Sequence, residues 1–427
     1  MRFASTLIAT LAAAAFSHGA NAGSLSDGKP FAGTTVKVLA VKSSQFEAHE
    51  ARLADFTEKT GIKVVYNYVP FPNMREALTA EMVGGTGDVD VVSVMDQWVA
   101  GMQMLLSPID KGVAARKIDL ANYPKAHLDQ GRLNGALVGL PVRGHIQLLF
   151  YRKDLLEKHG LKAPQTWADV VAVSKVLRDK EGIAGIALPY GKLNGQNLMV
   201  WYNLLWGQGG SLFDAAGKPI FNSDAGIAAT KDYIGFLTQE KITPSGAAGF
   251  VEQDAVNSFK QGNSAMVPVW WWVRSQLTDP KQSKLTDAQI GFAALPSYKD
   301  KGNTTYTNTW IFGINDRSKR KDAAMEFLTW LSQPALEKEV LLDTKQNEVV
   351  AVQFSNLRDA AVNARWGGMH MAAAKALETA PAIKYGEDWP KIVEVLENMM
   401  SGLAAGTKTD VKAALDAAAA DIAKMRK

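Results

Sequence analysis

Hydrophobic positions change their spacing several times along residues 34–94, and this marks out a series of short elements. Runs of β-branched and aromatic residues predict strands, and apolar residues that recur every three to four positions predict helices. The elements expected in order are strand 34–41, helix 47–60, strand 63–69, helix 75–82 and strand 89–94. Strands that alternate with helices predict a parallel sheet covered by helices, which is the α/β class. Ligands bind beyond the carboxyl ends of such strands, and Asp96, Gln97 and Trp98 follow the third one.

A second series of elements begins near residue 150. The expected elements are helix 166–177, strand 185–189, helices 225–238 and 253–261, strand 264–272 and a helical tail over 390–427. The strand over 264–272 ends in three consecutive tryptophans. A strand sends alternate side chains to opposite faces, so we expect Trp270 and Trp272 on one face and Trp271 on the other. At least one indole should then face a domain boundary or a ligand.

The first 22 residues have the layout of a secretory signal peptide. Arg2 precedes an apolar run over 7–16, and residues 20–22 read Ala-Asn-Ala, so we expect cleavage after Ala22. The chain has no cysteine, which excludes disulfides, thiolate catalysis and the lipid-bearing cysteine of a lipoprotein. Its formal net charge is +4 without a basic stripe, so we expect no nucleic-acid partner. The length of 427 residues predicts two domains.

Motifs for catalysis or metal binding are missing from the sequence. The six histidines form no His-x3-His pair, and the Gly-rich stretch 84–87 precedes a strand instead of a phosphate-binding helix. Glu252 and Asp254 form an acidic pair at the start of a predicted helix, where carboxylates favour the positive end of the helix dipole. We therefore expect no enzymatic activity, no cofactor and no metal ion.

Two stretches resemble a known family. Residues 148–177 read LLFYRKDLLEKHGLKAPQTWADVVAVSKVL, which is similar to the YxKDLLEKxGLxxPxTWxE segment of bacterial extracellular solute-binding proteins. This sugar-binding group includes maltose-binding protein. Residues 259–272 (FKQGNSAMVPVWWW) resemble the F-x-x-G-x-A-M strand of the family, which ends in a ligand-facing aromatic residue. Weaker likenesses follow in order over essentially the whole mature chain.

The resemblance implies a periplasmic binding protein fold of type II, with two α/β lobes and a hinge of several crossing segments. The hinge crossings are expected near 150–153, 292–296 and 328–334. The lobes would then be residues 33–149 plus 297–330 and residues 152–292 plus 335–427. The implied function is to capture a carbohydrate-class ligand and deliver it to an ABC permease in the inner membrane. We expect a periplasmic monomer.

The candidate ligand-binding residues combine flat aromatic rings with polar side chains, because sugars present both C–H patches and hydroxyl groups. They are Gln45, Asp96, Gln97, Trp98, Arg143, His145, Gln196, Asn197, Trp270, Trp271, Trp272, Asn308, Trp310 and Arg365. Core packing is the alternative for each tryptophan, and turn chemistry is the alternative for Gln196 and Asn197. Arg143 and Arg365 would suit a ligand with an anionic group, whereas a hinge ion pair is the alternative for Arg143.

Other function classes stay open on the sequence alone. A secreted glycoside-acting enzyme would also combine aromatic residues with carboxylates. A binder of a polyamine, a peptide or ferric ion is a nearer alternative. Ferric ion would need clustered tyrosine, histidine and carboxylate ligands, and the six scattered histidines offer few of these.

Overall fold

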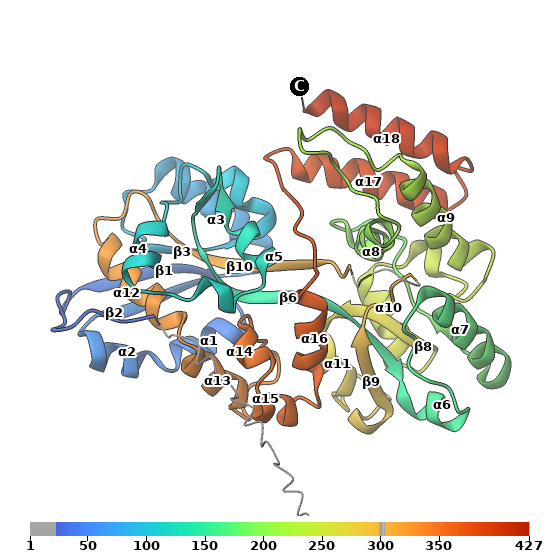
Figure 1. Ribbon diagram of the computed structural model, residues 1–427, viewed down its shortest axis with the longest axis horizontal. Coiled ribbons are helices and arrows are strands. Elements are labelled where there is room, and N and C mark those ends of the chain that lie inside the picture. Colours follow the sequence, from blue (N-terminus) through green and yellow to red (C-terminus); the bar gives the residue numbers. More distant parts are fainter. Residues whose placement is uncertain (1–22, 299–301, 303, 427) are drawn as a thin grey trace, which may run out of the picture.

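The computed structural model describes residues 23–298, 302 and 304–426, so the predicted signal peptide lies outside the described residues. Two lobes are joined by one continuous eight-stranded sheet, in which the strand order is β2-β1-β3-β10-β6-β8-β7 and β9 also pairs with β6 (Figure 1). Buried apolar side chains form two separate clusters, one in each lobe. The molecule therefore has two hydrophobic cores, as its length predicts.

The first lobe begins with the strands that the sequence pattern predicts. β1 (Thr35–Val41), β2 (Lys63–Val69) and β3 (Val91–Met95) pair in parallel. Their β-branched residues fill one core, and β10 (Thr307–Ile314) returns antiparallel beside β3. The parallel part of the sheet confirms the α/β class, and the carboxyl ends of its strands point toward the second lobe.

The predicted helix over 47–60 is two helices in the structure. The Oγ of Ser43 accepts a hydrogen bond from the Phe46 amide (3.3 Å) and begins α1 (Ser44–Glu50). The chain then breaks at Ala51 and Arg52 before α2 (Leu53–Thr60), which ends at Gly61 with a left-handed φ of 72°. The helix expected over 75–82 lies within the longer α3 (Phe71–Gly84), which Pro70 precedes.

One long strand, β6 (Leu140–Arg152), runs through both lobes. Up to Ile146 it pairs with β10, and from Gln147 onward it pairs with β8 (Ser264–Trp270) and β9 (Ile290–Ala294). The chain crosses between the lobes again from β9 to β10. Because β6 is hydrogen-bonded on both sides of the switch, the lobes are connected through paired backbone.

The second lobe surrounds the other end of the sheet with helices. The capping box predicted at Thr166 begins α7 (Trp167–Glu181), and β7 (Ala184–Ile186) pairs with β8. The acidic pair Glu252 and Asp254 lies in the first turn of a helix, as the sequence indicates. The other helices of this lobe are α6 (Lys153–Lys158), α8 (Met199–Gly207), α9 (Asp224–Thr238), α10 (Glu252–Lys260), α11 (Arg274–Thr278), α17 (Trp389–Ala404) and α18 (Val411–Met425).

The remaining helices lie in the first lobe and below the junction between the two lobes. They are α4 (Asp110–Ala115), α5 (Lys125–Gln130), α12 (Lys321–Leu331), α13 (Pro334–Leu342), α14 (Phe354–Leu357), α15 (Ala360–Arg365) and α16 (Met369–Leu377), with the short strands β4 (Arg132–Leu133) and β5 (Ala136–Leu137) beside them. After α16 the chain rises between the lobes toward α17. We call residues 378–388 the strap.

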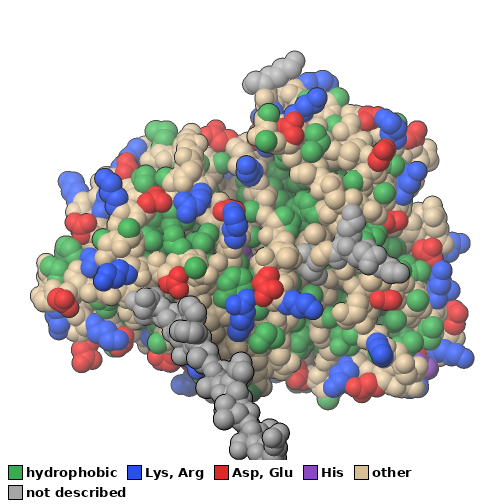
Figure 2. Space-filling model, in the orientation of Figure 1, with side chains coloured by type: hydrophobic (Ala, Val, Ile, Leu, Met, Phe, Trp, Pro, Cys, Tyr) green, Lys and Arg blue, Asp and Glu red, His purple; other side chains and the backbone are tan. Residues whose placement is uncertain are grey.

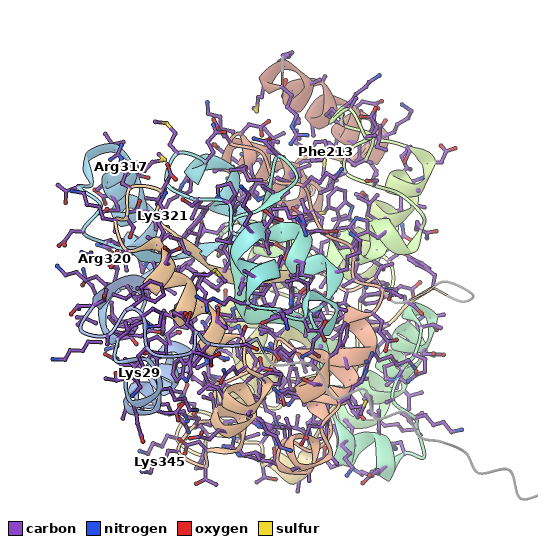
Figure 3. The ribbon with its side chains drawn as sticks, turned by 60° about the vertical axis from the view of Figure 1, so that its left-hand side comes forward. Lys29, Phe213, Arg317, Arg320, Lys321 and Lys345 are labelled. Carbon is purple, nitrogen blue, oxygen red and sulfur yellow. The ribbon has the colours of Figure 1, made fainter. Side chains whose placement is uncertain are left out.

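Charged side chains of both signs are scattered over the face of the molecule in Figure 2, with no block of one sign. Figure 3 shows Arg317, Arg320 and Lys321 together on the first lobe. The Arg320 Nε lies 3.0 Å from a carboxylate oxygen of the buried Asp90. Local ion pairs of this kind balance the charge without forming a basic surface. No helix within the described chain is long and apolar enough to cross a membrane.

Candidate functional site

One face of the sheet carries a row of polar and aromatic side chains across the junction between the lobes. Arg143 and His145 of β6 lie opposite Trp310 and Asn308 of β10, and Gln147 of β6 lies opposite Trp270 of β8. Alternate residues of a strand share a face, and residues directly opposite across a ladder share it too. All six side chains therefore stand on one face. We call Arg143, His145, Gln147, Trp270, Asn308 and Trp310 the floor of the site.

Four side chains of the floor have a buried polar atom with no hydrogen-bond partner among the described residues. The atoms are Arg143 Nε, His145 Nδ1, Gln147 Oε1 and Asn308 Oδ1. Nearly all buried polar groups in folded proteins are hydrogen-bonded, since an unmade bond costs about 1–3 kcal/mol. Four such atoms in one row across a lobe junction mark a surface that is built to bind a polar molecule.

Aromatic rings of the first lobe form a wall at one end of the floor. Phe71, the first residue of α3, stacks on Trp98 with ring centroids 5.9 Å apart, and Trp98 meets Trp310 edge-on at 5.5 Å. Phe71 is 50% exposed although it belongs to this cluster. Phe71 and Trp98 both follow the carboxyl ends of parallel strands, which is where such sheets bind ligands.

A second aromatic wall comes from the other lobe. Tyr306, in the segment that leads into β10, lies 5.6 Å from Trp270 and 5.3 Å from Tyr202 of α8, measured between ring centroids. The Trp272 ring lies 6.3 Å from the His145 ring and is only partly buried. The floor is thus flanked by aromatic rings on the sides of both lobes, an arrangement suited to the C–H faces of a sugar or polyol.

Hydroxyl and amide groups connect the two walls. The Gln97 Nε2 donates to the Tyr306 hydroxyl (3.1 Å), and that hydroxyl lies 3.2 Å from the hydroxyl of Tyr385 in the strap. Asp96 accepts hydrogen bonds from the amides of Gln97 (2.8 Å) and Thr309 (3.4 Å). Burial raises the pKa of Asp96 well above its ordinary value, despite these two hydrogen bonds.

Burial also sets the charge states on the floor. It lowers the pKa of Arg143 to about 10, against the opposing attraction of Glu348, so the guanidinium is still charged at neutral pH. Burial lowers the pKa of His145 well below its ordinary value, and the positive charge of Arg143 adds to the effect. The floor therefore presents one fixed positive charge beside a neutral imidazole.

The structure brings most of the predicted site residues together. Asp96, Gln97, Trp98, Arg143, His145, Trp270, Trp272, Asn308 and Trp310 line the floor or its walls. Sequence reasoning missed Phe71, Gln147, Tyr306 and Tyr385. Phe71 could have been found by the rule that selected Asp96, since it follows the end of β2, and Gln147 lies two residues beyond His145 on the same strand.

The remaining predicted residues have other contacts. Gln45 exchanges two hydrogen bonds with the backbone of Val350, and Gln196 accepts one from the Glu252 amide at the start of α10 (2.9 Å). The Asn197 Nδ2 donates to the carbonyls of Tyr190 and Glu397. These amides hold loops and helices in place.

Two further candidates, Trp271 and Arg365, also make contacts that stabilise the fold. The predicted strand over 264–272 is wrong at its end, because β8 stops at Trp270 and residues Trp271–Val273 form a 3₁₀ turn. Trp271 is fully buried, and its Nε1 donates to the Gly144 carbonyl (3.2 Å). The Arg365 guanidinium donates to the carbonyls of Leu341 and Gln346 and lies over the Trp366 ring, so its hydrogen bonds are used away from the floor.

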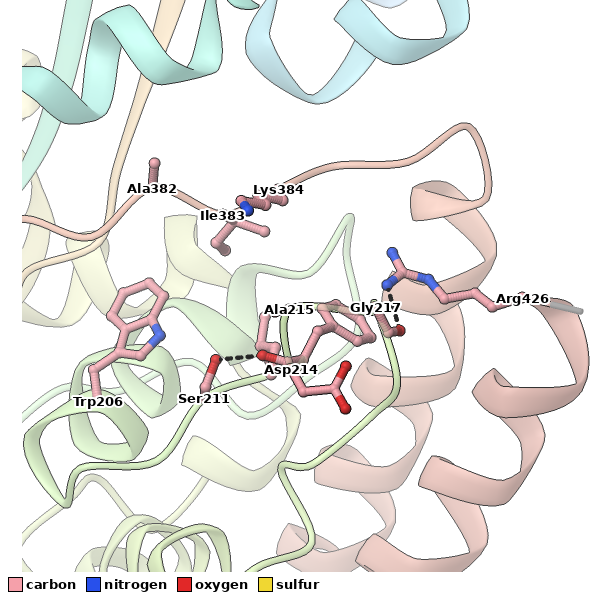
Figure 4. Close-up of a pocket in the computed structure, with 11 residues that line it drawn as sticks. Trp206, Ser211, Asp214, Ala215, Gly217, Ala382, Ile383, Lys384 and Arg426 are labelled. Carbon is pink, nitrogen blue, oxygen red and sulfur yellow. Dashed lines mark hydrogen bonds between the residues drawn. The ribbon is translucent and has the colours of Figure 1, made fainter. Parts of the chain in front are cut away.

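A separate cavity of about 260 Å³ lies in the second lobe between the strap and the loop that contains Phe213 (Figure 4). Its most prominent cation, Arg426, donates to the Gly217 carbonyl (2.9 Å) and to Asp388, and it covers the Phe213 ring at 3.8 Å. Arg426, Ser211 and Asp214 of this cavity have hydrogen-bond partners in the same lobe, and none of the four unpartnered polar atoms of the floor lies in it. Among the described residues no group of three or more histidines and carboxylates is placed to hold a metal ion.

The known proteins that this chain resembles are binding proteins. The family model for bacterial extracellular solute-binding proteins matches residues 41–338. A probable amino-acid ABC transporter periplasmic-binding protein of Sinorhizobium fredii is 31% identical over 316 residues, which cover 72% of this chain and 70% of that protein. The mannitol-binding protein of Pseudomonas aeruginosa is 30% identical over 279 residues, covering 62% of this chain and 61% of that one.

A solved structure shows the same architecture. The ABC transporter solute-binding protein of Agrobacterium radiobacter, in complex with ribitol, is 25% identical with a TM-score of 0.73, covering 93% of this chain and 100% of that one.

Proposed function

This chain belongs to the bacterial extracellular solute-binding protein family, and we propose that it captures a carbohydrate-class ligand, a sugar or polyol, for an ABC importer. Its fold is the two-lobe α/β fold of periplasmic binding proteins, as the sequence indicated. The single observation that carries the proposed ligand class is the row of four buried polar atoms without partners among the described residues. The row lies between two aromatic walls.

The chemistry of the row fits a polyhydroxy compound. Arg143 Nε can only donate, whereas Gln147 Oε1 and Asn308 Oδ1 can only accept. A hydroxyl group can do both, so one chain of hydroxyl groups can satisfy donors and acceptors together. Phe71, Trp98 and Trp272 supply flat apolar surfaces for the C–H faces between those hydroxyls. The relative named as a mannitol-binding protein and the similar structure solved in complex with ribitol support the same class.

We propose that the lobes close on the ligand. The floor lies where β6 changes partners, so a ligand there touches side chains of both lobes and favours an arrangement in which both contact it. The proposed lobes are residues 33–149 plus 297–330 and 152–292 plus 335–427. The further proposals are a periplasmic location after cleavage at Ala22, a monomeric state and an inner-membrane ABC permease as partner.

A panel of ligands tests the proposed class. Thermal unfolding of the mature protein should be measured with ribitol, D-mannitol, mono- and disaccharides, sugar acids and amino acids. A ligand that binds the folded state raises the melting temperature according to RT ln(1 + [L]/Kd). We expect polyhydroxy compounds to raise it and amino acids to leave it unchanged. Stabilisation by amino acids alone would overturn the proposal, and chemical conversion of a bound sugar would favour the glycoside-acting enzyme.

A further inference from the structure

Arg143 stands apart from the other arginines of the described chain. Its guanidinium forms no hydrogen bond or ion pair with any described residue, and its Nε is fully buried. Apart from the exposed Arg75, the other described arginines bond to a carboxylate or to a backbone carbonyl. A charged group in a partly buried place normally has such a partner.

The acidic side chains near Arg143 are committed to other contacts. The two carboxylate oxygens of Glu348 accept hydrogen bonds from the hydroxyls of Ser44 (3.1 Å) and Ser275 (3.2 Å). Both oxygens of Asp96 are bonded to backbone amides. Neither carboxylate lies within ion-pair distance of the Arg143 guanidinium in the described structure. The positive charge on the floor therefore has no neutralising group in contact with it.

We propose that the ligand of this site carries a carboxylate that binds the Arg143 guanidinium, so that the ligand is a sugar acid such as an aldonate or a uronate. This inference rests on the proposed carbohydrate-binding function and narrows its ligand class. An arginine and a carboxylate match in shape and charge, since two N–H groups can donate to the two oxygens in parallel. A ligand carboxylate also neutralises a positive charge that is otherwise buried without a partner, which adds to the gain on binding.

The rest of the floor fixes the direction of the ligand. Arg143, His145 and Gln147 follow one another on β6, and alternate residues of a strand are about 6.6–6.8 Å apart. The carboxylate lies at the Arg143 end, beside Trp310. The hydroxyl groups extend toward Asn308 and Gln147, whose unpartnered side-chain oxygens accept hydrogen bonds from them. The Arg143 end of the floor thus binds the acid, while the part of the floor nearer the second lobe binds the hydroxyl groups.

Matched pairs of acid and neutral compounds test the inference. Calorimetry should compare D-gluconate with D-glucitol and D-galacturonate with D-galactose, on the wild type and on Arg143→Gln and Arg143→Lys. We expect the wild type to bind the acid of a pair at least about tenfold tighter than the neutral partner. Arg143→Gln should lose this preference, and Arg143→Lys should keep part of it because it keeps the charge without the two-pronged donor geometry.

Control variants separate the possible outcomes. Arg274, which is already paired with Asp287 (2.6 Å), should tolerate Arg274→Gln without a change in the preference for the acid. Because Arg143 has no partner to lose, Arg143→Gln should melt no lower than the wild type, which shows that the variant is folded. Equal or tighter binding of the neutral compounds would overturn the sugar-acid inference and leave the proposed function standing. Binding of neither acids nor neutral compounds would overturn both.

Discussion

His145 and Asn308 lie directly opposite each other across β6 and β10, and each leaves one buried polar atom without a partner among the described residues. The two side chains stand one residue pair away from the point where β6 turns from the first lobe to the second. Side chains at that junction can contact a molecule held by either lobe. This position makes the pair the centre of the proposed binding surface.

Replacement of Asn308 by alanine should reduce ligand affinity with little effect on stability. The Oδ1 atom has no partner among the described residues, and the other side of the amide contacts the Tyr306 side chain, so the variant should lose only about 1 kcal/mol of unfolding free energy. A ligand hydroxyl that donates to it would lose its acceptor, so we expect affinity to fall at least about tenfold. Calorimetry and urea unfolding measure the two effects separately.

Asn197 provides the matched control for Asn308. Its Nδ2 donates to the carbonyls of Tyr190 (3.2 Å) and Glu397 (3.1 Å), so Asn197→Ala should lower the unfolding free energy by about 1–3 kcal/mol. Ligand affinity of the folded Asn197→Ala protein should stay close to that of the wild type. The reverse pattern in the two variants would show that the floor is not the binding surface.

The neighbouring residues Trp271 and Trp272 should behave differently when each is replaced by leucine. Trp271 is fully buried and bonded to the Gly144 carbonyl, so Trp271→Leu should cost about 3 kcal/mol or more of stability. Trp272 is partly exposed beside His145, so Trp272→Leu should reduce affinity while the melting temperature changes little. A loss of binding in Trp271→Leu without a loss of stability would contradict this assignment.

The sequence predicts most of the elements because short apolar runs are bounded by residues that end them. β2 lies where the pattern places it, and Gly61 ends the helix before it. The break between α1 and α2 and the turn after Trp270 could not be predicted, since neither contains a proline or a glycine. Both depend on tertiary contacts, such as the hydrogen bond from Trp271 to Gly144.

The sequence places candidate residues close together where one strand end supplies several of them, and it cannot place residues whose neighbours are decided by folding. Asp96, Gln97 and Trp98 follow directly from the end of β3. Tyr306 and Tyr385 come from the second crossing and the strap, and only the fold brings their hydroxyls together. The amides of Gln45 and Asn308 have the same chemistry, and their different roles depend on whether a backbone group lies within reach.

His370 should make the wild type less stable in acid than a variant that lacks this imidazole. Burial lowers the pKa of His370 to about 3, helped by the charges of Arg274 and Arg365, and neither ring nitrogen has a partner among the described residues. The folded state therefore keeps the ring neutral, while the unfolded chain takes up a proton below a pH of about 6.5. Stability attributable to this group is lost as pH falls below that value.

We expect His370→Leu to be at least as stable as the wild type at pH 7.5. Its advantage should grow by about 1 kcal/mol between pH 7.5 and pH 5.5, because the unfolded wild type alone gains the proton. Urea unfolding measures the unfolding free energy of both proteins at each pH. Taking the difference between the two proteins at one pH cancels the contributions of the buried groups that they share. An advantage that stays constant between the two pH values would mean that His370 is protonated in the folded state.

Closure of the lobes can be tested where they meet at the rim of the strap. The Gln103 Nε2, just after the first-lobe segment that holds Trp98, donates to the Glu387 carboxylate in the strap (2.8 Å). The chain has no native cysteine, so Gln103→Cys with Glu387→Cys provides a unique pair for a short bis-maleimide cross-linker. The control pair is Lys125→Cys with Asp129→Cys, both on α5 of the first lobe.

If ligand enters and leaves by separation of the lobes, the cross-link at the rim should slow both steps. We expect the association and dissociation rate constants of the tethered protein to fall at least about tenfold, because opening is needed for exchange in either direction. The same protein before cross-linking should exchange ligand like the wild type, and the tether on α5 should change neither rate. Stopped-flow tryptophan fluorescence can follow the exchange, since several tryptophans border the floor. Unchanged rates in the tethered protein would show that ligand reaches the floor without movement of the lobes, and the closing model would then be wrong.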